Sequence, residues 1–430
     1  MKRIMRDLVG EVSETRDLFQ MADGVAGPAQ PARDPAALGN NADFATDPVP
    51  SGFDIHSVLP PPSTVTAWYL RSVGREIMKA HGVSRRMRWC GSKISRGGGG
   101  ISVWSRPDRT YGRLGGVCVC GQSICCPVCA PRIAAFRAVE VSEAFKRAGD
   151  AGWVASLETF TRPHKLDRRP GALLKDLEGF SQLWRSYGEG GRASRREKAS
   201  RGHHLGREVN WGDANGWHYH HHRLRYDLPD TFDPSLARAQ WLAVLDGRGL
   251  MTEGAEKHAY DCGAVGSEAG ARYIAKVSTS VEAQARSIGS ELASSATKGR
   301  SINSLLLDHV RGDLQAGSTW LNGVACVTAR KVASVRWSRG LRYALGMEAS
   351  EKSDETIAAE EAAPSDELLG ALNPWQWQVV LRWKAEFALC CTAQKGRDAV
   401  NEFLRGLDLG PLDTEDPRLS WRATTNKEGF

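Results

Sequence analysis

The chain has 430 residues, of which 41% are hydrophobic and 25% charged, an ordinary balance for a soluble globular protein large enough for two or three domains. This composition excludes a fibrous chain. No apolar run approaches the roughly 18 residues that a membrane-spanning helix needs, and the charged N-terminus lacks the apolar core of a signal peptide, so a cytoplasmic protein is expected.

The net charge of +7 is unevenly distributed. Residues 348–367 hold eight acidic residues and one lysine, a local charge of −7, so the rest of the chain carries +14. We interpret 348–367 as an acidic linker. So high a positive charge outside 348–367 indicates a polyanionic partner such as nucleic acid. The alternative is a basic surface that only keeps the protein soluble.

In chain order, residues 1–62 are expected to be a disordered leader, because 22–62 is rich in Pro, Gly, Ala and Asp and has few large apolar groups. An N-terminal region, 63–149, follows and ends in a predicted helix. Five of the ten cysteines fall between 118 and 129. Without a secretion signal, such a cluster indicates metal binding and not a disulfide framework.

Three thiolates in this cluster have zinc-ligand spacing: Cys120, Cys126 and Cys129. A Cys-Pro-x-Cys knuckle followed at once by a helix is typical of structural zinc. Cys118 is favoured as the fourth ligand, because Cys118-Val-Cys120 can reach one ion from an extended segment. Cys90 and Cys125 are alternatives, as is a reduced cluster without metal. A closed four-ligand site would serve folding or DNA docking, not catalysis.

Residues 150–347 are predicted as the catalytic domain. Within it we expect a strand at 153–160, an amphipathic helix at 173–187, a mobile basic loop within 185–207 and a helix at 267–285. Two further strands, REVNW and WHYHHHRLRYDL, flank the turn-forming sequence GDANG and predict a hairpin. A mostly helical C-terminal region, 368–430, completes the chain.

The hairpin concentrates histidines, since its second strand contains GWHYHHHRL. Strand alternation directs His218, His220 and His222 to one face and His221 to the opposite, outward face. If Trp211 pairs with Trp217, Glu208 lies opposite His220, close enough for both to bind one cation; a loop shorter by one residue would turn Glu208 away. Two histidines and a carboxylate suit a catalytic divalent ion, although exposed sheet histidines or phosphate contacts remain alternatives.

Three blocks in this order resemble the plasmid rolling-circle replication initiators, which belong to the HUH endonuclease superfamily. They are SLETFTRPH, then REVNWGDANGWHYHHHRL, then ARYIAKV with its Tyr-x-x-Lys. The resemblance covers roughly 115–346. The sequence departs from the family pattern at His221, where a hydrophobic residue is usual, and at the glutamate of SLETF.

The resemblance implies an α+β fold with a central antiparallel sheet and flanking helices, preceded by the zinc-binding segment and followed by the helical tail. It implies that Tyr273 attacks DNA to form a 5′-phosphotyrosyl bond and free a 3′-hydroxyl, assisted by Mg²⁺ or Mn²⁺ on His220, His222 and Glu208. Lys276 would stabilise the phenoxide. Termination needs either a second tyrosine or an activated water, for which Glu268 is the candidate base. Tyr260 is the less favoured candidate for the nucleophile.

The implied partners are plasmid origin DNA, a host helicase and a DNA polymerase, without a membrane. Two other functions remain open at this point. A conjugative relaxase or transposase would use the same chemistry, although the upstream cysteines and the downstream VRWSRGLRYALGM block favour the initiator. A zinc-containing DNA-binding regulator would bind DNA with steep salt dependence but form no covalent product.

Overall fold

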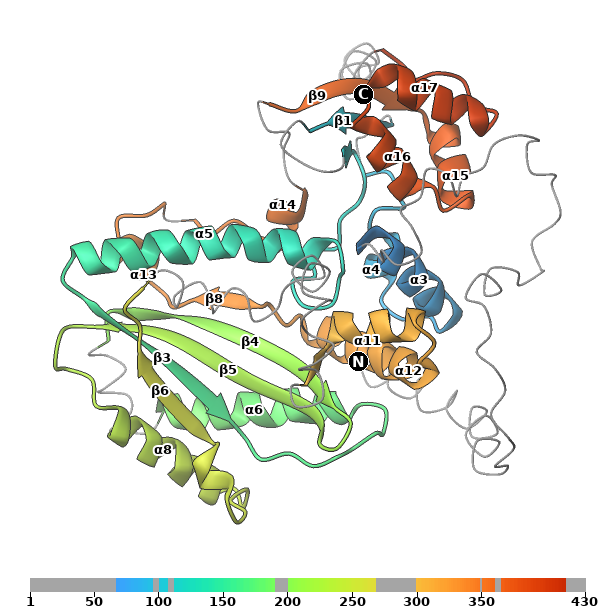
Figure 1. Cartoon of the computed structure of the whole chain (residues 1–430). Helices are drawn as coiled ribbons and strands as arrows, with labels where there is room; N and C mark the ends of the chain where they lie inside the picture. Colours follow the sequence, from blue (N-terminus) through green and yellow to red (C-terminus); the bar gives the residue numbers. More distant parts are fainter. Residues whose placement is uncertain are drawn as a thin grey trace, which may run out of the picture. The chain divides into compact units, whose positions relative to one another are not determined.

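The computed structural model describes residues 67–95, 100–106, 112–189, 200–267, 299–348, 350–359 and 365–414, all within one compact unit, Gly52–Phe430. The expected leader lies outside these residues. Two antiparallel sheets organise the described chain (Figure 1). None of the described helices is both long and apolar enough to span a bilayer.

The larger sheet has six strands in the order β6-β3-β5-β4-β7, with β8 pairing beside β7 along β4. Every pairing in it is antiparallel, which confirms the predicted α+β class with an antiparallel central sheet. The strands are β3 (Val154–Thr161), β4 (Gly202–Gly212), β5 (Gly216–Asp227), β6 (Tyr260–Ala264), β7 (Arg300–Ser301) and β8 (Val335–Trp337).

The predicted hairpin is β4 and β5, which pair continuously from Gly202–Tyr226 to Gly212–Gly216. Its closing glycine is required in two ways. Gly216 has φ 78°, a left-handed conformation that disfavours other residues, and a Cβ there would meet the backbone of the chain near Asp167 at 3.1 Å. The turn sequence therefore both closes the hairpin and sets its register.

Helices cover the two faces of this sheet (Figure 1). On one face, α5 (Cys129–Asp150) packs Val141 against Leu224 and Tyr226 of β5. On the other face lie α6 (Ala172–Glu189) and α8 (Pro234–Asp246). There Phe160 is the centre of an edge-to-face aromatic cluster with ring centroids 5.0–5.4 Å away, a favourable geometry for aromatic rings. Its partners are Trp184, Tyr187, Trp241 and Tyr260.

The smaller sheet joins the two ends of the described chain in the order β2-β1-β9: β1 (Ile101–Ser105), β2 (Arg113–Gly115) and β9 (Glu367–Leu372). The expected mostly helical C-terminal region thus opens with a strand that the sequence analysis missed. Helix α15 (Pro374–Arg382) begins only after it, where Asn373 and Gln376 form a capping box. The remaining helices here are α3 (Ala67–Ala80), α4 (Arg85–Trp89), α16 (Glu386–Ala393) and α17 (Arg397–Gly406).

The described part of the acidic segment is packed against the body, unlike the linker we expected. Helix α14 (Asp354–Ala359) buries Ile357 and Ala358, and Arg132 of α5 donates to the Ala358 carbonyl. The other helices are η3 (Ala255–Lys257), just before β6, α11 (Ile302–Val310) and α12 (Leu314–Arg330), between β7 and β8 in the chain, and α13 (Leu341–Ala344), after β8.

Candidate metal centre on the histidine hairpin

The hairpin register places a carboxylate among the histidines. Trp211 pairs with Trp217, and Glu208 lies directly opposite His220, which confirms the predicted register. Because β-strand side chains alternate, Glu208, His220 and His222 share one face of the sheet. It is the face that α5 covers farther along β5, at Leu224 and Tyr226.

These three side chains converge on one point. The Glu208 Oε2 atom lies 2.5 Å from Nε2 of His220 and 3.1 Å from Nε2 of His222. One ligand atom from each residue lies within 4.8 Å of the other two, so the group could hold a metal ion. Two imidazoles and one carboxylate leave coordination positions open to substrate.

Glu208 is held as an anion. Burial acts to raise the pKa of its carboxyl, but hydrogen bonds from His220 and His222 outweigh burial and bring the pKa well below its usual value. Asn210 adds a hydrogen bond from its Nδ2 to the other oxygen, Oε1, at 2.7 Å. A carboxylate held ionised and oriented in this way is ready to bind a cation.

His222 is held in the neutral form that a metal ligand must have. Burial lowers the pKa of His222, and its Nδ1 lies 3.0 Å from the hydroxyl of Thr159, the residue paired with it on β3. Nδ1 of His220 is buried without a hydrogen-bond partner among the described residues. Neither Asn210 nor Thr159 was predicted from the sequence, although Asn210 shares its strand parity with Glu208 on β4.

A second group that could hold a metal consists of four buried cysteines: Cys90, Cys120, Cys126 and Cys129. Sγ of Cys90 lies 3.8 Å from that of Cys126 and 3.5 Å from that of Cys129, and the Cys120–Cys129 distance is 3.7 Å. A tetrahedron with zinc–sulfur bonds of about 2.3 Å has edges of about 3.8 Å, so these separations fit zinc. They are far too long for disulfides.

The fourth member of this group is Cys90 and not Cys118, which we favoured from the sequence. The thiol of Cys118 instead donates to the carbonyl of Ile94 at 3.5 Å, because its short extended segment pairs with the chain that follows α4. Cys125 faces away, toward Met87, and burial raises its pKa to about 12. The group joins the end of α4 to the first residue of α5.

One known protein is similar to this chain over most of both sequences. It is "Protein rep" of Streptomyces lividans, 26% identical over 317 aligned residues, which cover 58% of this chain and 69% of the relative. No family model matches the chain, and no solved structure matches it.

Two further histidines adjoin the metal group on the same face. His218 stacks on His164 with ring centroids 4.4 Å apart and lies 4.6 Å from the ring of His220. Burial and the neighbouring His220 lower the pKa of His218 to about 3, and burial lowers that of His164. Neither belongs to the three-ligand group, so at neutral pH they are uncharged neighbours of it.

His221 points away from the ligands as predicted, but it does not face outward. It is buried under α6, with its ring 4.3 Å from that of Phe180 and its Nε2 2.8 Å from the hydroxyl of Tyr219. Burial lowers its pKa well below the usual value. A buried neutral histidine therefore fills the position where the resembling family carries a hydrophobic residue.

The glutamate of SLETF, the other departure from the family pattern, is paired with an arginine inside the same core. Glu158 is fully buried and accepts from Nε of Arg223 at 2.6 Å and from the hydroxyl of Tyr260 at 2.8 Å. Burial raises the pKa of Tyr260 far above its usual value. Tyr260 thus lies on the sheet face opposite the metal group, in a position unsuited to a nucleophile.

The residues expected to carry the nucleophile and its helpers, Tyr273, Lys276 and Glu268, lie outside the described residues, as does most of the helix predicted at 267–285. The chain is described again from Gly299. Arg300 pairs with Trp211, and Ser301 pairs with Asn210, the residue that donates to Glu208. The chain that follows the expected nucleophile therefore returns to the sheet beside the metal group.

Proposed function

We propose that the protein is a plasmid rolling-circle replication initiator of the HUH endonuclease type, which nicks one strand of its origin and later rejoins it. The observation that carries the proposal is the convergence of Glu208, His220 and His222 on one face of the central sheet. Similarity to a protein named rep supports a replication role. The basic body of the chain suits a DNA substrate.

In the proposed reaction the phenolate oxygen of Tyr273 attacks the scissile phosphorus. The new phosphotyrosyl bond joins the protein to the 5′ end of the cut strand, and the bond from phosphorus to the 3′ oxygen breaks, so that this oxygen leaves and takes up a proton. The phosphoester is conserved, which allows the 3′-hydroxyl to attack back and rejoin the strand. Until then the 3′-hydroxyl can serve as the primer for a host polymerase, while a host helicase opens the duplex.

The described residues hold and orient the reacting phosphate. Glu208, His220 and His222 would bind Mg²⁺ or Mn²⁺, with Asn210 and Thr159 fixing two of the ligands. A divalent ion bound there polarises the phosphate and offsets the charge that grows on its oxygens. Lys276 is proposed to stabilise the phenolate, and Glu268 to activate water when replication ends.

The four-cysteine group is proposed as a closed structural zinc site. With Cys90, Cys120, Cys126 and Cys129 as ligands it has no open position for substrate. Its contribution is to fix the first turn of α5, the helix that packs on the same sheet face as the metal group.

The experiment uses labelled single-stranded oligonucleotides that tile the DNA on either side of the protein's own gene. With Mn²⁺ present, the wild-type protein should cut one of them and leave a denaturant-stable protein–DNA adduct. His220→Ala should do neither, whereas Lys257→Ala, an exposed residue far from the hairpin in sequence, should do both. Full cleavage by His220→Ala would refute the metal assignment. DNA binding without any adduct would favour a regulator without chemistry.

A further inference from the structure

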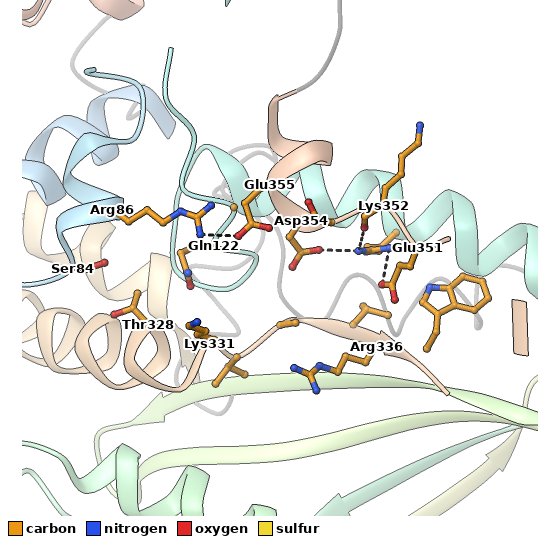
Figure 2. Close-up of a pocket in the computed structure, with 17 residues that line it drawn as sticks. Ser84, Arg86, Gln122, Thr328, Lys331, Arg336, Glu351, Lys352, Asp354 and Glu355 are labelled. Atoms are coloured by element: carbon orange, nitrogen blue, oxygen red, sulfur yellow. Dashed lines mark hydrogen bonds and ion pairs between the residues drawn. The ribbon is translucent and has the colours of Figure 1, made fainter. Parts of the chain in front are cut away.

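A pocket of about 530 Å³ lies between strand β8, the C-terminal end of α12 and the acidic segment (Figure 2). Cationic side chains reach it from four separate elements. These are Arg86 of α4, Arg137 of α5, Lys331 at the end of α12 and Arg336 of β8. Such a concentration of positive charge in one hollow creates a site for an anion.

Part of this charge is already paired with carboxylates from a single short stretch of the acidic segment. Glu355 lies 2.8 Å from Arg86, while Asp354 and Glu351 each lie 3.0 Å from Arg137. Figure 2 shows these three acids along the upper side of the pocket, with Lys331 and Arg336 along the lower side. The acidic segment thus acts as an anion that the chain itself supplies.

Lys331 and Arg336 are exposed, and neither has an ion-pair partner within the described residues. Lys331 also has φ 50°, a left-handed conformation that is unfavourable for a non-glycine residue. The helix dipole accounts for a cation at the end of α12. It does not account for Arg336, which reaches the same hollow from a strand.

The pocket is close to the metal group in the sheet. Val335, which lines the pocket, pairs with Gly206, and Gly206 pairs on its other side with His222. Two strand spacings of about 4.8 Å each separate Val335 from His222, about 10 Å in all. Arg336, the next residue, pairs with Leu205 and leaves β8 on the opposite face from His222, so DNA that reaches both sites would pass around this edge of the sheet.

We propose that the pocket binds the phosphate backbone of DNA next to the nick site, and that Glu351, Asp354 and Glu355 occupy it as a phosphate mimic that DNA displaces. The inference rests on the proposed function for the identity of the polyanion. Lys331 and Arg336 would make the first phosphate contacts. Arg86, more than half exposed, would exchange Glu355 for a phosphate oxygen.

The test measures how the affinity for a short labelled DNA duplex of mixed sequence changes with salt concentration. Each phosphate contact contributes about 0.9 to the slope of log K against log salt. The double variant Lys331→Asn/Arg336→Gln should reduce the magnitude of that slope by about 1.8, the contribution of two phosphate contacts. Asparagine is chosen at 331 because it tolerates a positive φ. The matched control, Lys384→Asn/Arg311→Gln, changes another lysine at positive φ and another exposed arginine.

A second pair of variants tests the competition. Glu351→Gln/Glu355→Gln should bind the duplex more tightly than Glu253→Gln/Glu256→Gln, which changes the net charge equally at exposed positions elsewhere. If the slope of Lys331→Asn/Arg336→Gln equals that of its control, the pocket is not a phosphate site. If the two glutamine pairs bind alike, the acidic segment is no competitor. The binding assay contains no divalent ion, so its slope reports on the pocket even if the nicking proposal fails.

Discussion

Glu208 lies directly across from His220 on the neighbouring strand, with its Oε2 atom 2.5 Å from the histidine Nε2. The same oxygen lies 3.1 Å from His222, so the carboxylate joins both imidazoles. Loss of a residue that only orients a metal ligand weakens metal binding by about 10- to 100-fold. Glu208→Ala removes a proposed ligand itself, so it should weaken Mn²⁺ binding by at least about 100-fold. Calorimetric titration with Mn²⁺ measures this, and unchanged affinity would mean that the ion binds elsewhere.

The cysteine group makes a prediction that separates Cys90 from Cys118. Cys90→Ser should lower the zinc content, because it removes one of four converging thiols. Cys118→Ser is the matched control and should keep its zinc, since that thiol lies outside the converging group and donates to the Ile94 carbonyl. Elemental analysis of the purified variants decides between them; zinc lost from Cys118→Ser and kept by Cys90→Ser would reverse the assignment.

The buried pair of Glu158 and Arg223 predicts a non-additive stability effect. Arg223→Met leaves a fully buried carboxylate without its arginine and should cost about 3–5 kcal/mol in the free energy of unfolding. Glu158→Gln combined with Arg223→Met should recover a large part of that loss, because no buried charge then remains unpaired. Denaturant titration of both variants measures the difference. A double variant no more stable than Arg223→Met would exclude the ion pair as the cause.

Because His204 is buried, we expect the folded protein to lose stability in acid. His204 lies on β4, fully buried with its ring 4.2 Å from that of Trp337 on β8, and burial lowers its pKa from 6.5 to about 3. The unfolded chain binds a proton there below pH about 6.5 and the folded chain does not, so stability falls as pH falls through this window, by up to about 1.4 kcal/mol per pH unit. His204→Gln should show a shallower decline between pH 6 and 4. Parallel declines would show that His204 does not contribute.

The hairpin was predictable because its information is local. Turn residues fix which strand residues face each other, and parity then assigns each side chain to a face, so Glu208 and His220 could be paired from the sequence. Strand parity does not say which face of the sheet is exposed to solvent, because this depends on how the helices pack against the sheet. His221 was expected outside and lies inside because α6 covers its face.

The fourth cysteine shows the same limit. Cys120, Cys126 and Cys129 are close in sequence, and their spacing alone indicates a metal knuckle. Cys90 arrives from the end of α4, about thirty residues earlier, so only the tertiary fold could select it over the nearby Cys118. Strand β9 was missed for a related reason, since its pairing partner β1 lies more than 250 residues away in the sequence.

The central claim is that the Glu208, His220 and His222 group serves a nucleophilic Tyr273. Mass spectrometry of the peptides from the Mn²⁺-dependent protein–DNA adduct tests it most directly. We expect the nucleotide on the peptide that contains Tyr273, and we expect Tyr273→Phe to form no adduct. Attachment at Tyr260 or any other residue, or an undiminished adduct with Tyr273→Phe, would contradict it.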